Sequence, residues 1–218
     1  MLSFDILMYI ETFVCNPFME NTYLVYDDTA ACVVIDAGCL TDVERNRLQQ
    51  TIEKHHLKLE HVLNTHLHLD HVFGNGFLYQ TYHLAPEAHR EDEFLLSQLH
   101  AQAALFGVPF NEKVQPIGSY LEDCDHVAFG NSSFEVIHVP GHSPGSICFY
   151  SRDDQIIFVG DVLFRGSIGR TDLPKGNFEQ LIHGIQHRLL VLPDETKVYS
   201  GHGIVTTIGQ EKAENPYL

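Results

Sequence analysis

The sequence has no long apolar run and no basic region near its N-terminus. Its opening segment, MLSFDILMYIETFVC, mixes apolar and acidic residues and is more typical of a strand than of a secretion signal. No stretch supplies the roughly 20 apolar residues that a membrane-spanning helix requires. These two absences predict a cytoplasmic protein that has no membrane partner.

Cysteine is sparse and shows no pattern of its own. There are five cysteines, an odd number, and no two of them form a C-x-x-C pair. Small secreted proteins that rely on disulfides, and zinc sites built from cysteine, both need denser and more regular spacing. The sequence therefore predicts neither a disulfide framework nor a cysteine-zinc site.

Positive charge is also in short supply, with 13 lysines and arginines against 29 aspartates and glutamates. The formal net charge of −16 argues against a nucleic-acid partner, because phosphates repel an acidic surface. A local basic spot that binds an anionic small molecule remains compatible with this balance. Histidine, in contrast, is plentiful at 15 residues.

The 218 residues show no repeat and no long polar linker, which predicts one domain over residues 1–218. The expected strands are Ile6–Phe13, Asn21–Tyr26, Ala31–Asp36 and His61–Asn64, followed by Ser133–His138, Ser146–Tyr150, Gln155–Val159 and Lys197–Ser200. The expected helices are Asp42–His55, Pro86–Phe106 and Phe178–Leu190, the last with Asn177 as its N-cap. Two similar halves favour an α/β (α+β) protein, a four-layer αββα sandwich.

The densest group of possible metal ligands is His66-Leu-His68-Leu-Asp70-His71, which directly follows a predicted buried strand. Imidazole and carboxylate groups are good ligands for zinc and similar divalent ions. In extended backbone His66 and His68 share a face, whereas Asp70 and His71 fall where the chain turns. These directions favour two neighbouring ions over one, and the alternative is a polar loop that is rich in histidine by chance.

Three more candidates follow strands of the second half, each beside a glycine that permits close backbone approach. They are His142 in Pro140-Gly-His-Ser-Pro-Gly145, Asp161 in Val159-Gly-Asp161, and His202 in Ser200-Gly-His-Gly203. We expect one ion on His66, His68 and His142, a second on Asp70, His71 and His202, and Asp161 between the two.

A pair of divalent ions predicts hydrolysis. A bound metal lowers the pKa of water towards about 7, and a hydroxide shared by two ions can attack an ester or thioester carbonyl. We expect Asp70 to orient this water, so that Asp70 and Asp161 are the catalytic carboxylates. The segment Gly141–Gly145 places Ser143 between two glycines, but the adjacent His142 is better used as a metal ligand, which argues against a serine triad.

These motifs resemble those of the metallo-β-lactamase-fold superfamily and, within it, the glyoxalase II-like hydrolases of the single-domain bacterial type. The resemblance is carried by Thr65–His71, Gly141–Gly145, Gly160–Asp172 and Gly201–Gly203, with Asn21–Leu24 and Ile35–Gly38 as opening strands. It implies the αββα sandwich and two divalent ions, usually zinc, with iron or manganese as alternatives. It also implies hydrolysis of thioesters such as S-lactoylglutathione or a related small acyl thioester, although the glutathione-binding helical domain has no counterpart here.

Three cations lie close to Asp161 in the sequence, namely Arg165, Arg170 and Lys175. A cation at this place could bind a carboxylate of a small-molecule substrate through charge-assisted hydrogen bonds. The alternative for Arg170 is an ion pair with Asp172 or another surface acid. The oligomeric state is not predicted by any of these features.

The same family resemblance is also compatible with other functions. Persulfide dioxygenases share the stretch Gly169–Asp172 but use a single iron, whereas the complete second ligand set around His202 favours hydrolysis. Lactonase, β-lactamase and other ester hydrolase activities also occur within the superfamily that the motifs resemble. A metal-binding sensor would hold the ions without turnover, and a nuclease would be expected to carry a basic surface.

Overall fold

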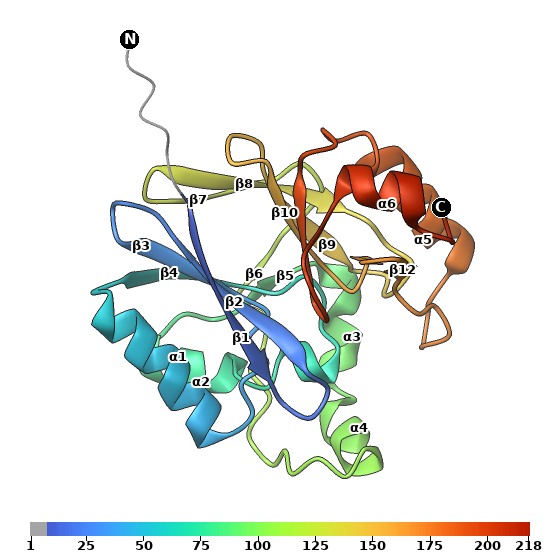
Figure 1. The fold of residues 1–218 in the computed structure, drawn as a ribbon. Coiled ribbons are helices and arrows are strands. Elements are labelled where there is room, and N and C mark those ends of the chain that lie inside the picture. The colour runs from blue at the N-terminus through green and yellow to red at the C-terminus, as the bar shows by residue number, and fades with distance from the viewer. Residues whose placement is uncertain (1–7) are drawn as a thin grey trace.

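The computed structural model describes residues 8–218, which form two six-stranded sheets packed face to face (Figure 1). The first sheet has the order β1 (Tyr9–Cys15), β2 (Glu20–Tyr26), β3 (Ala31–Ile35), β4 (Lys58–Leu63), β5 (Glu87–Ala88) and β6 (Ser119–Tyr120). The second has the order β14 (Thr206–Thr207), β13 (Lys197–Ser200), β10 (Ile156–Gly160), β9 (Ile147–Ser151), β8 (Ser132–His138) and β7 (His126–Phe129). A small hairpin pairs β11 (Leu163–Phe164) with β12 (Ser167–Ile168).

Helices cover the outer faces of both sheets, which confirms the four-layer αββα prediction. The first sheet carries α1 (Asp42–Lys54) and α2 (Asn75–Tyr82). The second carries α5 (Phe178–Gly184), the π-helical turn η3 (Ile185–Leu189) and α6 (Ile208–Glu214). The 3-10 turns η1 (Leu69–His71) and η2 (Arg90–Asp92) lie near α3 (Glu93–Leu96) and α4 (Leu99–Leu105) at one edge of the sandwich (Figure 1).

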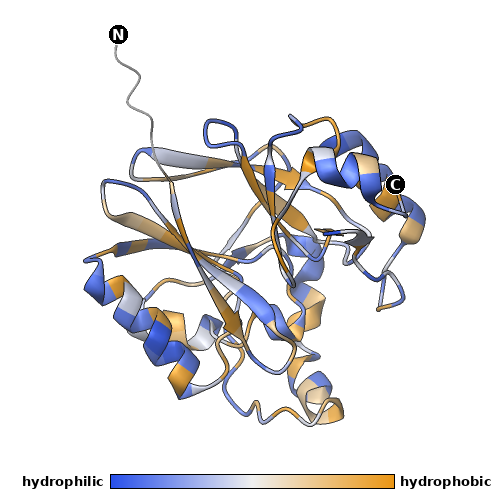
Figure 2. Cartoon of the chain, viewed as in Figure 1, coloured by the Kyte–Doolittle hydropathy of each residue, from blue (hydrophilic) through white to orange (hydrophobic). Residues whose placement is uncertain are grey.

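The apolar core is divided into layers that match this architecture. Between the sheets, Val33 and Ile35 of β3 meet Phe134, Phe149 and Phe158 of the second sheet. Separate clusters join each sheet to its own helices, and a fourth surrounds α3, α4 and the loop after β4. Figure 2 shows the same division, with hydrophobic residues concentrated on the strands and hydrophilic ones along the outside of α1. Burial of apolar surface therefore holds the four layers together.

Helix ends follow local rules that the sequence displays. Thr41 accepts a hydrogen bond from the backbone N–H of Glu44, whose side chain in turn accepts from the Thr41 N–H, so the start of α1 is a complete capping box. Asn177 accepts from the Gln180 N–H and begins α5, as predicted. These caps fix where each helix starts and thus how it lies on its sheet.

Two predicted elements have other bounds in the structure than in the sequence analysis. The strand expected over Ile6–Phe13 begins among residues 1–7, which lie outside the described part, and is seen as β1 from Tyr9 onward. The helix expected over Pro86–Phe106 is wrong as a single element. Glu87 pairs in parallel with Leu63 of β4, so this part extends the sheet, and α3 and α4 are separate short helices. The apolar residues that recur at helical spacing in this segment belong to both helices, which pack onto one hydrophobic cluster.

All five cysteines are free thiols, in agreement with the predicted lack of disulfides. Cys15, Cys32, Cys39 and Cys148 are buried in the core, whereas Cys124 is exposed in the turn before β7. Among residues 8–218 we find no helix with the length and apolar character needed to cross a membrane.

Candidate metal centre

The predicted ligands come from four loops that leave the sheets at the same edge. Thr65–His71 follows β4, residues 140–145 join β8 to β9, Asp161 follows β10, and His202 follows β13. Strand β4 runs parallel to β3, and β13 runs parallel to β10. Because parallel strands end at the same edge of a sheet, their following loops meet there. We call this end of the sandwich the ligand edge.

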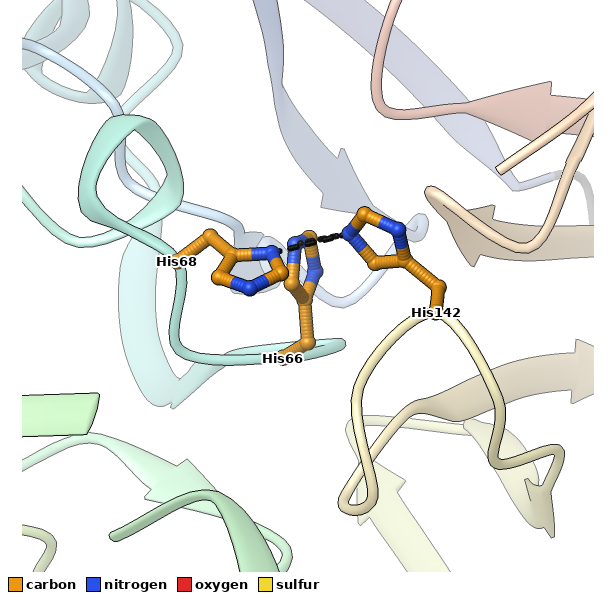
Figure 3. A group of neighbouring side chains, drawn as sticks. All are labelled: His66, His68 and His142. Carbon is orange, nitrogen blue, oxygen red and sulfur yellow. Dashed lines mark hydrogen bonds between the residues drawn. The ribbon is translucent and has the colours of Figure 1, made fainter. Parts of the chain in front are cut away.

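His66, His68 and His142 form the first group at the ligand edge (Figure 3). The His68 Nδ1 atom lies 2.8 Å from His142 Nε2, which lies 3.3 Å from His66 Nε2. Figure 3 shows the three rings turned toward one another, two from the loop after β4 and one from the loop after β8. All three side chains are buried. The structure therefore brings together the first predicted ligand set.

Asp70, His71 and His202 form the second group. The Asp70 Oδ2 atom lies 3.1 Å from His202 Nε2 and 3.7 Å from His71 Nε2. Asp161 stands between the groups, with Oδ1 3.5 Å from His71 Nε2 and Oδ2 3.7 Å from His142 Nε2. The seven predicted residues thus converge in the predicted division of three, three and one.

The donor atoms fit divalent cations. A tetrahedral site with metal–nitrogen bonds of about 2.0–2.1 Å places its donors about 3.3 Å apart, close to the separations within both groups. The buried atoms His71 Nε2 and Asp161 Oδ1 have no hydrogen-bond partner. Leaving such atoms unpaired costs free energy unless another group satisfies them. These two atoms lie 3.5 Å apart, so one cation held by the second group and Asp161 would satisfy both.

Hydrogen bonds behind the ligands fix which imidazole nitrogen faces the centre. The Nδ1–H of His142 donates to the carbonyl oxygen of Arg170 at 2.8 Å, which leaves Nε2 with a free lone pair. His66 Nδ1 lies 3.1 Å from the Thr65 hydroxyl, which itself donates to Asp36 Oδ2 at 2.6 Å. Outer contacts of this kind orient ligands and increase their basicity.

Asp36 is a site residue for which the sequence analysis predicted no role. It is buried at the end of β3 with a left-handed φ of 52°, accepts from the Thr65 N–H at 2.7 Å, and has Oδ2 3.1 Å from His71 Nδ1. The negative charge of Asp36 favours the protonated form of His71 and raises its pKa. The available signal was an aspartate directly after an apolar strand and just before Ala-Gly, which is typical of a strand end at a site.

The two ligand groups differ in their electrostatic environment. Burial lowers the pKa of His66 well below its usual range and lowers that of His68 to about 3, so both are neutral ligands at pH 7. Burial also opposes protonation of His71, but the carboxylates of Asp70 and Asp161 outweigh it and raise the pKa of His71 to about 10. The second group is therefore the more anionic environment and has the stronger electrostatic attraction for a cation.

Asp92 is a second residue that the sequence analysis missed. It lies at the end of η2, is fully buried, and belongs to neither sheet. Its carboxylate accepts from the Ser143 hydroxyl and the Gly145 N–H, both at 2.6 Å, and from the Leu67 N–H at 3.2 Å. One side chain thus joins the loop that holds His142 to the loop that holds His66 and His68.

Gly201 shows why glycine flanks the ligands. A Cβ atom at this position would lie 2.4 Å from Asp161 Oδ1 and 2.6 Å from His71 Cε1. Distances this short exclude any side chain, so the backbone before His202 packs directly against two ligands. The predicted close approach is confirmed here.

A cavity of about 540 Å³ opens above the ligands. His68, Asp70, His142, Asp161 and His202 form its floor, and its walls are mostly apolar. Arg170 lies at its rim and donates two hydrogen bonds of 2.7 Å to Asp172. Arg165 lies instead in a neighbouring open hollow beside His202, and the Lys175 Nζ atom lies 3.7 Å from the Phe94 ring centroid. The three predicted substrate-binding cations therefore occupy three different surroundings.

A four-layer αββα sandwich with histidine and aspartate ligands at one edge defines a class of metal-dependent hydrolases. The sequence model of the metallo-beta-lactamase superfamily matches residues 15–202, and the chain belongs to this superfamily. Membership implies that the ligand edge binds divalent metal. The fold and the ligand convergence described above agree with this membership.

Three proteins are similar to this chain over nearly its whole length. The hydroxyacylglutathione hydrolase GloC of Haemophilus influenzae is 40% identical over 214 residues, which cover 97% of this chain and 98% of that protein. The crystal structure of the B3 metallo-beta-lactamase BLEG-1 has a TM-score of 0.86 and 34% identity, covering 96% of this chain and 99% of that one. The crystal structure of TTHA1623 in a di-iron-bound form has a TM-score of 0.84 and 36% identity, covering 96% and 100%.

Proposed function

We propose that the protein hydrolyses small acyl thioesters with two divalent metal ions at the ligand edge. The convergence of the seven predicted side chains into two groups that share Asp161 is the observation that carries this proposal. The 40% identity to a hydroxyacylglutathione hydrolase supports a thioester as the substrate class. The di-iron form of TTHA1623 supports two ions at a site of this kind.

We propose zinc as the physiological metal, held by His66, His68 and His142 in one group and by Asp70, His71 and His202 in the other, with Asp161 shared. Neutral imidazole and carboxylate donors at tetrahedral spacing suit zinc, and iron or manganese suit the same donors. When bound, such ions polarise the thioester carbonyl and make water nucleophilic at neutral pH.

The chain itself contributes position and proton transfer. Asp70 lines the cavity floor, where its carboxylate can accept a hydrogen bond from the attacking water and receive its proton. As the new carbon–oxygen bond forms, the carbon–sulfur bond breaks and its electron pair leaves on sulfur. The proton then passes to the thiolate or to solvent, so that one water is consumed and one carboxylic acid and one thiol are formed.

The test combines metal analysis with a substrate panel. We expect purified protein to hold about two equivalents of metal and to hydrolyse S-lactoylglutathione or simpler acyl thioesters faster than a lactone, a β-lactam or a persulfide. Removal of metal by a chelator should abolish turnover, and added zinc should restore it. Metal-free protein of undiminished activity, or oxygen uptake with a persulfide by protein that holds one iron, would contradict the proposal.

A further inference from the structure

The cavity above the ligands has two apolar walls that come from distant parts of the chain. Leu105 and Phe106, at the end of α4, form one side with Phe18 from the β1–β2 turn, and Leu173 and Pro174 form the other. The Phe18 and Phe106 rings pack edge to face with centroids 5.5 Å apart. Figure 1 shows α4 and the β1–β2 turn on the same side of the molecule.

These walls remain open to solvent although they are apolar. Leu105 is 80% exposed and Phe106 is 58% exposed. Exposed apolar residues that line a concave site typically meet an apolar part of a ligand, because covering them removes apolar surface from water. The ligand groups at the cavity floor place the reacting carbonyl within reach of the same walls.

The cavity walls offer no unpaired basic side chain to an anionic acyl group. Among the described residues that line it, Arg170 is the only lysine or arginine, and both of its hydrogen bonds to carboxylate go to Asp172. The open hollow on the other side of His202 contains Arg165 among the apolar residues Phe164 and Ile204. His202 lines both spaces, so a substrate can extend from one to the other.

We infer that the acyl group of the substrate is an uncharged, apolar chain longer than a lactoyl group, and that it lies along Phe106 and Leu173. This inference rests on the proposed thioester hydrolysis. The thiol portion then lies on the other side of His202, where Arg165 can meet an anionic carrier. Hydrophobic burial along the cavity walls selects the acyl chain.

The experiment uses metal-loaded protein and thioesters of one uncharged thiol, N-acetylcysteamine, with acetyl, butyryl, hexanoyl, lactoyl and succinyl groups. We expect kcat/KM to rise about fourfold for each added methylene, as burial of that group predicts. The lactoyl and succinyl thioesters should be poorer substrates than the butyryl thioester. Acetyl thioesters of longer alkyl thiols should show no comparable rise.

A substitution in the wall tests the assignment directly. Phe106→Arg replaces apolar surface by a cation, so the ratio of hexanoyl to succinyl hydrolysis should fall by roughly tenfold or more. Val43→Arg is the matched control, because Val43 is 79% exposed on α1, outside the cavity lining. The control should keep the original ratio, and thermal unfolding of both variants would verify that they fold.

The outcomes separate the two proposals. Hydrolysis that rises with the alkyl chain of the thiol instead of the acyl group would overturn the inference, as would equal rates for succinyl and hexanoyl thioesters. Both results would leave metal-dependent thioester hydrolysis intact. Failure to hydrolyse any thioester in the metal-loaded state would overturn the proposed function itself.

Discussion

The two ends of the sandwich are each held together by a buried carboxylate. At the end opposite the ligand edge, Asp27 in the β2–β3 turn accepts from the N–H of Asn131 in the β7–β8 turn at 2.7 Å and from the hydroxyl of Ser132 at the start of β8 at 3.1 Å. At the ligand edge Asp92 joins the loops after β4 and β8. Both side chains are almost completely buried.

The difference lies in where each carboxylate comes from. Asp27 belongs to a turn of the first sheet and contacts a turn of the second. The two sheets are therefore joined here by residues of their own turns. Asp92 comes from the segment between β5 and α3, outside both sheets, and contacts the backbone next to the ligands. The ligand edge thus depends on an inserted segment that the opposite end does without. Asp27 and Asp92 thus make the same kind of hydrogen bonds. They differ in what these bonds hold: Asp27 joins two turns, whereas Asp92 joins the loops that carry metal ligands.

The largest effect should follow removal of a ligand at the ligand edge. Asp161→Ala and His68→Ala should each lose at least about a hundredfold in activity, beyond the range for outer contacts, together with bound metal. His126→Ala is the control, since His126 is exposed in the hollow beside Asn131 and Arg152. Activity and metal content measured on the same samples provide the readout. Equal losses in the control would show that the two ends do not differ in function.

An intermediate effect should separate the two buried carboxylates. Asp92→Asn and Asp27→Asn each place an amide where backbone N–H groups donate, so each should lower the free energy of unfolding by about 1–3 kcal/mol. Only Asp92→Asn should also weaken metal binding, by roughly 10- to 100-fold, through the loops of His66, His68 and His142. Calorimetric metal titration and the visible spectrum of the cobalt-substituted protein measure this. If both variants bound metal as tightly as the wild type, Asp92 would be a stabilising residue only.

The smallest effect should come from surface arginines at the two ends. Arg170 pairs with Asp172 at the cavity rim, and Arg152 lies 3.7 Å from Glu135 at the opposite end. Both pairs are exposed and should contribute less than about 1 kcal/mol to stability. Arg170→Ala should raise KM a few-fold with unchanged metal content, because the apolar stem of Arg170 lines the cavity. Arg152→Ala should change neither KM nor metal content. An unchanged KM for Arg170→Ala would remove this arginine from the substrate pocket.

Much of the fold was accessible from sequence because its signals are local. Strand Lys197–Ser200 and the helix that begins after Asn177 were predicted at their observed starts, since apolar pattern and cap residues lie within a few positions of each other. The ligands were also accessible, because four of them form one dense cluster after a predicted strand and the other three each follow a predicted strand next to glycine. Their convergence then follows from strand direction.

Other features depend on partners far along the chain. The contacts of Asp92 with Ser143 and Gly145 span more than 50 residues, and no local pattern distinguishes this aspartate from the acidic residues around it. The segment 86–106 has a helical apolar period, yet pairing of Glu87 with Leu63 overrides it at the start. The cavity walls join Phe18 to Phe106, an association that only the tertiary fold creates.

The distribution of thiols has a practical consequence. Burial raises the pKa of Cys15 to about 11 and that of Cys32 to about 12, and the other two core thiols are equally enclosed. In the native state a thiol reagent can thus reach Cys124 alone, which makes this position a natural attachment point for a probe. The rate at which the remaining four become labelled would then report how fast the layers open, with Cys148 in the second sheet, Cys15 and Cys32 in the first, and Cys39 in the loop after β3.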